Sequence, residues 1–140
     1  NKTFGTNVIY TSLDFDQTAD ESAYRSTVVP SYIGTIGTST LVIEWTASAG
    51  TAAQTFVPTV TYRCVTDDEV FDSLTTPNSR NASSSDALIA TNDLHQTTIT
   101  LTNGDFAAND TCWFQLFRDV SEDSLAADAK VVRAQFNIQW

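Results

Sequence analysis

The chain has 140 residues, which suits one compact domain that buries about two thirds of its unfolded surface on folding. Only 17% of the residues are charged, whereas 22 Thr and 13 Ser make the polar surface rich in hydroxyl groups, as is common on β-sheets. The formal net charge of −10 argues against nucleic acid and anionic membrane surfaces as partners, and no apolar run approaches the ~20 residues of a membrane span.

Apolar and polar residues alternate with a period of two along much of the chain, which is the pattern of a strand with one buried face. Strands are predicted, in chain order, at 4–10, 26–33, 40–47, 56–66, 97–102, 112–117 and 131–140. In the third of these, Trp45 shares a face with Leu41 and Ile43 and is therefore predicted to lie in the core. In the last, Val131 is predicted to face away from the core, and the core-facing residues are Val132, Ala134, Phe136, Ile138 and Trp140.

Turn signals separate these predicted strands. They contain Gly, Asn or Asp and lie at 34–37, 47–53 and 103–105. Short helical turns are predicted at 67–74 and 121–129, and the Ser- and Asn-rich segment 77–85 is predicted to be an exposed loop. Short strands at this spacing, without a sustained helical period, predict one all-β domain over residues 1–140. The expected architecture is an antiparallel β-sandwich of jelly-roll type, with short helical turns at most.

Several blocks of the chain carry a family resemblance. The blocks are Phe15–Tyr24 (FDQTADESAY), Thr40–Trp45 (TLVIEW), Phe56–Val65 (ending in YRCV), Phe106–Thr111, Phe117–Asp119 and Ala127–Ala129. Together they resemble a β-sandwich domain that recurs in small virion or appendage proteins of tailed bacteriophages. The chain departs from that pattern at Cys64 and Cys112, where aliphatic residues are expected, and at 125–127, where Met with Gly is usual.

The resemblance implies a non-enzymatic structural protein on the exterior of the virion. It would be a capsid decoration (cement) protein or a head or tail appendage module, and its partners would be the major capsid protein or other virion subunits. Decoration proteins at capsid three-fold positions are commonly trimers, so a homo-oligomer is expected and a trimer is favoured. The alternative is an extracellular carbohydrate-binding β-sandwich of the tail-fibre or secreted adhesin type, with a glycan as its partner.

Large apolar groups lie on both faces of the predicted strand at 112–117. Phe114 and Leu116 share one face, and Trp113 and Phe117 share the other. A strand with one solvated face should not show this pattern, so the second face is covered either by the chain's own loops or by another subunit. Trp113 and Phe117, together with Tyr32, are therefore candidate interface residues, and under the alternative they are candidate glycan contacts.

The densest acidic cluster is a candidate calcium site, because Ca²⁺ prefers carboxylate oxygens. Its members are Asp14, Asp16, Asp20 and Glu21. The spacing lacks the Gly and the final Glu of an EF-hand loop, so a solvated loop that leads into a strand is the favoured interpretation, and no metal is predicted.

Nothing in the sequence indicates a catalytic site. His95 is the only histidine, and no Gly-x-Ser-x-Gly motif accompanies it, so neither a zinc site nor a Ser-His-Asp triad is indicated. Glycoside hydrolysis needs two carboxylates in a cleft, and Glu44 alone lies in the middle of a predicted strand. We therefore predict a protein with no enzymatic activity and no cofactor.

The two cysteines, Cys64 and Cys112, both fall on the inward faces of predicted strands. A disulfide between them would join two strands and contribute roughly 3 to 4 kcal/mol to stability in the chain-entropy model. The other possibility is a pair of buried thiols that act as small apolar residues, which a reducing cytoplasm favours at first. We expect the two side chains to lie close enough to bond.

Overall fold

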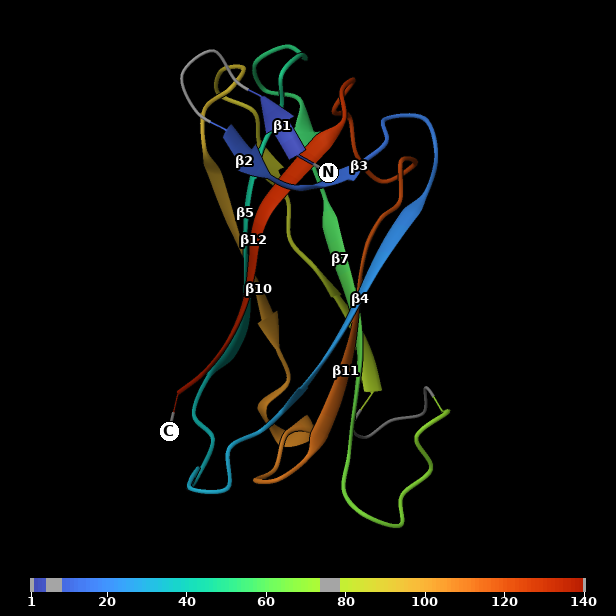
Figure 1. The fold of residues 1–140 in the computed structure, drawn as a ribbon, viewed down its shortest axis with the longest axis vertical. Coiled ribbons are helices and arrows are strands. Elements are labelled where there is room, and N and C mark those ends of the chain that lie inside the picture. Colours follow the sequence, from blue (N-terminus) through green and yellow to red (C-terminus); the bar gives the residue numbers. More distant parts are fainter. Residues whose placement is uncertain (1, 5–8, 74–78, 140) are drawn as a thin grey trace.

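The computed structural model describes residues 2–4, 9–73 and 79–139, most of which belong to two four-stranded antiparallel sheets packed face to face (Figure 1). The strands of the main sheets are β3 (Leu13–Phe15), β4 (Glu21–Val28), β5 (Ser39–Thr46), β7 (Pro58–Val65), β8 (Ser79–Ser83), β10 (His95–Leu101), β11 (Thr111–Arg118) and β12 (Ala129–Ile138). Two small pairs accompany them, β1 (Lys2–Phe4) with β2 (Ile9–Thr11) and β6 (Thr55–Phe56) with β9 (Asp86–Ala87). Within the described part of the chain, no helix is long and apolar enough to cross a membrane.

The strand order is that of a jelly roll. One sheet has the order β10–β5–β12–β3 and the other has the order β4–β11–β7–β8. The chain crosses between the sheets after β3, β4, β5, β8, β10 and β11, so β7 and β8 are the one consecutive pair of main strands within a described sheet. Eight antiparallel strands wound in this way form a double-sheet jelly roll. The predicted fold class is confirmed.

The core lies between the two sheets and is built from the alternating inward residues of the strands. In β5, β10 and β11 the alternation follows the predicted period of two. Trp45 is fully buried, as predicted, and packs against Phe56 with the rings inclined by 57° and their centroids 5.1 Å apart. Its indole N–H donates to the Asp86 carboxylate at 2.9 Å, which satisfies the polar atom of a buried aromatic side chain. Trp140, the other tryptophan predicted for the core, lies outside the described residues.

The prediction for the first residues of the last strand was wrong, because β12 contains a bulge. Val131 pairs with Trp45 and the next paired residue, Arg133, pairs with Glu44, so Val132 is an extra residue in the ladder. The bulge reverses the parity on one side of it. Val131 is therefore buried with 3% exposure, whereas Val132 is only half-buried.

The predictions for one loop, one strand and the short helical turns also need correction. Residues 79–83 of the predicted loop form β8, because pairing with β7 satisfies their backbone groups despite a composition poor in strand formers. The strand predicted at 26–33 is β4, which ends at Val28 shortly before Pro30, a residue with no backbone N–H. The described residues of 67–74 and 121–129 contain no helix, and Ala129 already belongs to β12. In the part of the chain that the structure describes, the 3-10 turn lies at Asn103–Asp105.

Candidate binding face

The outer face of the β4–β11–β7–β8 sheet carries aromatic side chains where a solvated sheet face would carry polar ones. Alternate residues of β11 point into the core, so Trp113, Gln115 and Phe117 point outward, and each is half-buried. The antiparallel register places Tyr24 of β4 opposite Gln115. This makes Tyr24 a diagonal neighbour of Trp113, within reach of a large ring.

Tyr24 and Trp113 stack on each other on this face. Their ring centroids are 5.8 Å apart and the planes are inclined by 29°. Tyr24 is 64% exposed, so one side of the stacked pair remains open to solvent. The Gln115 side-chain amide donates to the Ser22 hydroxyl at 2.9 Å and to the Tyr24 hydroxyl at 3.4 Å, which places polar groups beside the rings.

The other side of Trp113 is bounded by the loop that follows β7. Arg63 lies directly opposite Trp113 in the sheet, and its guanidinium donates to the backbone carbonyl of Val70 at 2.9 Å. This contact holds the loop against the sheet. A hollow of about 270 Å³ lies between them, and it is lined by Arg63, Phe71, Asp72, Ser73 and Trp113. We refer to Tyr24, Phe71 and Trp113 as the aromatic platform.

The structure separates the three aromatic residues predicted as contacts. Trp113 belongs to the platform, and Phe117 lies further along the same face, opposite Ser22 and Thr59. Tyr32 is 73% exposed in the loop between β4 and β5 and is not part of this sheet face. The chain's own loop thus covers the second face of β11 in part. Phe71 could not be predicted as a contact residue, because nothing in the sequence places a loop residue beside a particular strand.

The acidic residues of the candidate calcium site act as hydrogen-bond acceptors within and between turns. The carboxylate of Asp16 accepts from the backbone N–H and hydroxyl of Thr18, and these bonds hold the pKa of Asp16 below its ordinary value. Glu21 accepts from the backbone N–H of Asp16, and Asp20 accepts from that of Val120. Asp14 accepts from the Ser12 hydroxyl. Among the described residues, no group of three or more His, Cys, Asp or Glu side chains could hold a metal ion.

Arg118, at the end of β11, is fully buried and joins the end of β11 to residues 15–16 and 123–127. Its guanidinium forms a two-point salt bridge with Asp123 at 2.7 and 2.9 Å. It also donates to backbone carbonyls at 2.6–3.1 Å, those of Phe15, Asp16, Leu125 and Ala127. These contacts satisfy a charged group away from water. They also give a physical role to the FRD and ADA blocks of the sequence, which meet at this residue.

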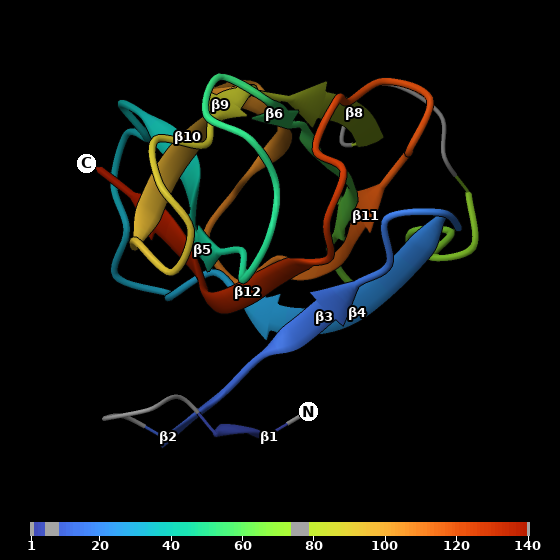
Figure 2. The same cartoon turned by 90° about the horizontal axis from the view of Figure 1, so that it is seen from above.

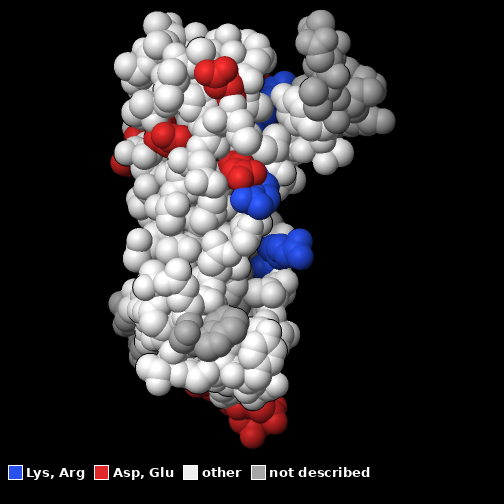
Figure 3. Space-filling view, turned by 90° about the vertical axis from the view of Figure 1, so that its left-hand side faces the viewer, with Lys and Arg blue, Asp and Glu red and all other residues white. Residues whose placement is uncertain are grey.

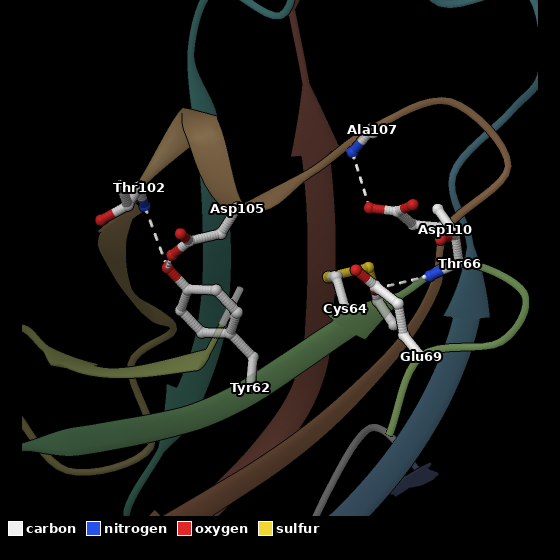
Figure 4. Close-up of a disulfide and its surroundings, with 9 residues drawn as sticks. Tyr62, Cys64, Thr66, Glu69, Thr102, Asp105, Ala107 and Asp110 are labelled. Atoms are coloured by element: carbon white, nitrogen blue, oxygen red, sulfur yellow. Dashed lines mark hydrogen bonds between the residues drawn. A yellow bond between two sulfur atoms is a disulfide. The ribbon is translucent and has the colours of Figure 1, made fainter. Parts of the chain in front are cut away.

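A disulfide joins Cys64 of β7 to Cys112 of β11 in the core (Figure 4). The two residues are directly opposite in the antiparallel register, with Cα atoms 4.0 Å apart, and both are fully buried. Inward parity, which the sequence predicts for both, is therefore confirmed. The bond lies between neighbouring strands of one sheet.

Two buried carboxylates lie near the disulfide in the segment that leads into β11 (Figure 4). The Tyr62 hydroxyl donates to Asp105 at 2.9 Å, and burial raises the pKa of Tyr62. One oxygen of Asp110 accepts from the backbone N–H of Ala107 at 2.8 Å, whereas the other is buried with no hydrogen-bond partner. Burial, and secondarily the charge of Glu69, raise the pKa of Asp110.

His95 is the first residue of β10, and its ring stacks on Trp45 at a centroid distance of 4.7 Å. It is buried with 4% exposure, and its Nε2 lies 3.4 Å from the carbonyl oxygen of Ala90. His95 therefore packs as a core residue at the start of a strand.

No family model matches the chain, and no curated protein or solved structure shows significant similarity to it.

Proposed function

We propose that the protein is a non-enzymatic structural component of a tailed-phage virion, either a capsid decoration protein or a head or tail appendage module. In this role it binds the major capsid protein or another virion subunit on the particle exterior and assembles as a homo-oligomer. The observation that carries the proposal is the aromatic platform on the outer face of the β4–β11–β7–β8 sheet. A half-covered aromatic patch of this kind is most simply a contact surface for another protein.

The chemistry of the other polar residues supports a structural role. Arg118 and its carboxylate partner Asp123 are fully engaged in holding the chain together, and the carboxylates of Asp16 and Asp20 accept hydrogen bonds from turns. Asp119 behaves in the same way, because the Ser121 hydroxyl and backbone N–H hold its pKa below the ordinary value. The residues that carry the phage resemblance thus hold the jelly roll in shape and leave the platform for binding.

Co-sedimentation with phage particles that lack the protein tests this proposal. The wild-type chain is expected to bind, and Trp113→Ala should weaken binding at least tenfold because hot-spot aromatic residues contribute about 2 kcal/mol or more. Ile89→Ala is the matched control, since Ile89 is 75% exposed in the segment after β9, which is hydrogen-bonded to Ala47 and Gln54. Failure of the wild-type chain to bind any such particle, or equal binding by Trp113→Ala, would contradict the proposal.

A carbohydrate-binding module is the second candidate function, and the hollow beside Trp113 favours it. An exposed aromatic face can stack on a sugar ring, and the hollow adds polar groups from Arg63, Asp72 and Ser73 around that ring. Binding on a glycan array that disappears in Trp113→Ala, with no binding to particles, would place this function ahead of the first. Retention of glycan binding in that variant would exclude the platform as a sugar site.

A further inference from the structure

The described strands leave the sandwich open along one side, between β12 and β4. On the opposite side β10 lies beside β8 and β9, as the view from above shows (Figure 2). β3 pairs with β12 only at residues 129–131, and within the described residues no strand pairs with that edge of β12 from residue 133 to 138. β4 is the edge strand of the other sheet. The described strands therefore do not close the space between the two sheets on this side.

Inward residues on this side of the sandwich are exposed, although they face the core. Ala134 and Phe136 of β12 pair with the buried residues Ile43 and Leu41, so all four share the inward face of the sheet. Ala134 is nevertheless exposed, and Phe136 is only half-buried. Leu13 of β3, which is also large and apolar, is 48% exposed. The described residues thus leave part of the apolar core uncovered.

These residues line an apolar groove of about 630 Å³ between the sheets. Its apolar walls include Leu13, Ala23, Leu41, Phe114, Leu116 and Phe136. A second hollow of about 340 Å³ shares Thr27 and Phe136 with the groove and extends it to Ile138. Small-molecule sites have volumes of about 300–1,000 Å³ and mostly apolar walls. The elongated shape of this groove suits a chain-like molecule better than a compact one.

Among the residues that line the groove, Arg25 of β4 alone carries a charge. In the described part of the chain, its guanidinium forms no ion pair and no hydrogen bond. The other basic residues of the two flanking strands have acidic neighbours, since Arg133 contacts Glu44 at 2.6 Å and Lys130 lies opposite Asp14. Arg25 is therefore the cation that is available to an anion in the groove.

The charge around the groove is positive, although the whole chain carries −10. Segments 22–32 and 129–140, which include most of β4 and all of β12, contain three basic residues and no acidic residue. Lys and Arg side chains lie together along one border of the face drawn in Figure 3, and most of the acidic side chains on that face lie elsewhere. Because salt screens distant charges more than near ones, an anion is attracted to this groove.

We propose that the groove between β12 and β4 binds a linear aliphatic carboxylate, that is, a free fatty acid. The alkyl chain lies on the apolar floor of the groove, and the carboxylate accepts hydrogen bonds from the Arg25 guanidinium. Arginine is well suited to this contact, because its planar fork matches the two oxygens of a carboxylate. The inference goes beyond the proposed function, because it needs no virion subunit.

The strands that flank the groove carry features that oppose the addition of a further strand. Inward-pointing charges, bulges and charged side chains on edge strands are the means by which proteins prevent strand addition. Arg25 pairs with Phe114, whose side chain is buried, so Arg25 lies on the inward face of the edge strand β4. β12 carries the bulge at Val132 and the side chains of Lys130 and Arg133. An aliphatic chain needs no backbone pairing, so these features do not oppose its binding.

Equilibrium dialysis of the full chain against decanoate, below the concentration at which decanoate forms micelles, tests the proposal. The wild-type chain is expected to bind decanoate. Octanoate should bind about tenfold more weakly, because it buries two fewer methylene groups. Decanol, which has the same number of carbon atoms and no charge, should bind at least about fivefold more weakly, because it forms no charge-assisted hydrogen bond with Arg25.

Two arginine variants separate recognition of the carboxylate from the effect of net charge. Arg25→Gln should weaken decanoate binding about tenfold and leave decanol binding unchanged. Arg133→Gln is the matched control, since it removes the same charge from the neighbouring strand at a residue that does not line the groove. This control should bind decanoate as the wild type does. An equal loss in both variants would mean that binding follows net charge, which overturns the proposal.

A third variant locates the alkyl chain. Ala134→Trp fills the groove at an exposed position, so the fold should persist, and the urea midpoint checks this. The variant should bind decanoate and decanol at least about tenfold more weakly, whereas Ile89→Trp, at an exposed residue outside the groove, should bind both as the wild type does.

The remaining outcomes overturn the proposal. If the wild-type chain binds neither ligand, the groove is not a fatty-acid site. If it binds decanoate and decanol equally, the groove takes apolar chains without recognising the carboxylate. If Ala134→Trp binds decanoate normally, the ligand lies elsewhere. Because no phage particle is present, these results are independent of the particle-binding test of the proposed function.

Discussion

Arg118 shows how one buried charge can organise a domain with a small core. Its guanidinium satisfies Asp123 and four carbonyl groups, so its removal would leave a buried carboxylate and several carbonyls without donors. The side chains of Arg118 and Asp123 are 0% and 2% exposed. Salt bridges that are this well buried depend on both partners.

We expect Arg118→Ala to lower the free energy of unfolding by about 3–5 kcal/mol, the usual cost of leaving a buried charge unpaired. The matched control is Arg133→Ala, which removes the exposed Arg133–Glu44 pair and should cost less than about 1 kcal/mol. Urea denaturation of both variants provides the measurement. If both variants lose the same free energy of unfolding, the buried network of Arg118 contributes no more to stability than an exposed ion pair does.

Asp110 provides a pH-dependent test at the same scale. The pKa of Asp110 is higher in the folded protein than in the unfolded chain. Ionisation of Asp110 therefore opposes folding when the pH is above the folded-state pKa, and it has no effect on stability when the pH is below the unfolded-state pKa. Asp110→Asn keeps the acceptor for Ala107 N–H and removes the buried charge. The variant should therefore be more stable than the wild type at pH 7, on the order of 1 kcal/mol, and this advantage should shrink as the pH falls toward 3. Urea midpoints at the two pH values measure the difference; a constant difference would contradict the assignment.

At the scale of the element, β12 illustrates how a bulge changes the role of neighbouring residues. The two valines are chemically identical, but the extra residue in the ladder sends Val131 into the core and leaves Val132 at its margin. Bulges also bend a strand, and β3 pairs with β12 only at residues 129–131, before the bulge.

The two valines can be distinguished by their alanine variants. Val131→Ala is expected to lower the free energy of unfolding by about 2 kcal/mol, because it removes two buried methyl groups. Val132→Ala should cost less than half as much, since that side chain is half-buried. Thermal or urea unfolding under identical conditions measures both. A larger loss for Val132→Ala than for Val131→Ala would contradict the bulge and would agree with the strict alternation that the sequence predicts.

At the scale of the whole molecule, the disulfide links the middle of the chain to the strand before last. It joins residues separated by 48 positions, so it restricts a large part of the unfolded chain. Both strands also pair along their full length, which means that folding brings the two sulfur atoms together before any bond is needed.

Reduction of the disulfide should therefore weaken the fold without changing it. In the chain-entropy model a loop of this size contributes about 4 kcal/mol to stability. Equilibrium unfolding with and without a reductant measures the loss, and the variant Cys64→Ala/Cys112→Ala, which has no bond to reduce, should be insensitive to the reductant. Titration of two free thiols shows that the wild-type disulfide is fully reduced. If the unfolding midpoint of that reduced protein equals the midpoint of the oxidised protein, this expectation is contradicted.

The sequence by itself determined the fold class and most of the core. Alternation with a period of two is local, because each residue's face follows from its neighbours, so Trp45, Phe114 and the two cysteines could be assigned to the inside. Asp16 and Asp20 lie in the exposed loop between β3 and β4, where their carboxylates accept hydrogen bonds from backbone N–H groups. Turn residues act within a few positions, and their spacing is visible in the sequence.

Only the tertiary structure decided the features that depend on contacts between distant segments. The register between β7 and β11 places Cys64 opposite Cys112, and the loop after β7 brings Phe71 to Trp113. Residues 79–83 become a strand only because β7 offers an edge, and the bulge at Val132 appears only in the pairing with β5. Each of these depends on which strands are neighbours, and local periodicity carries no information about that choice.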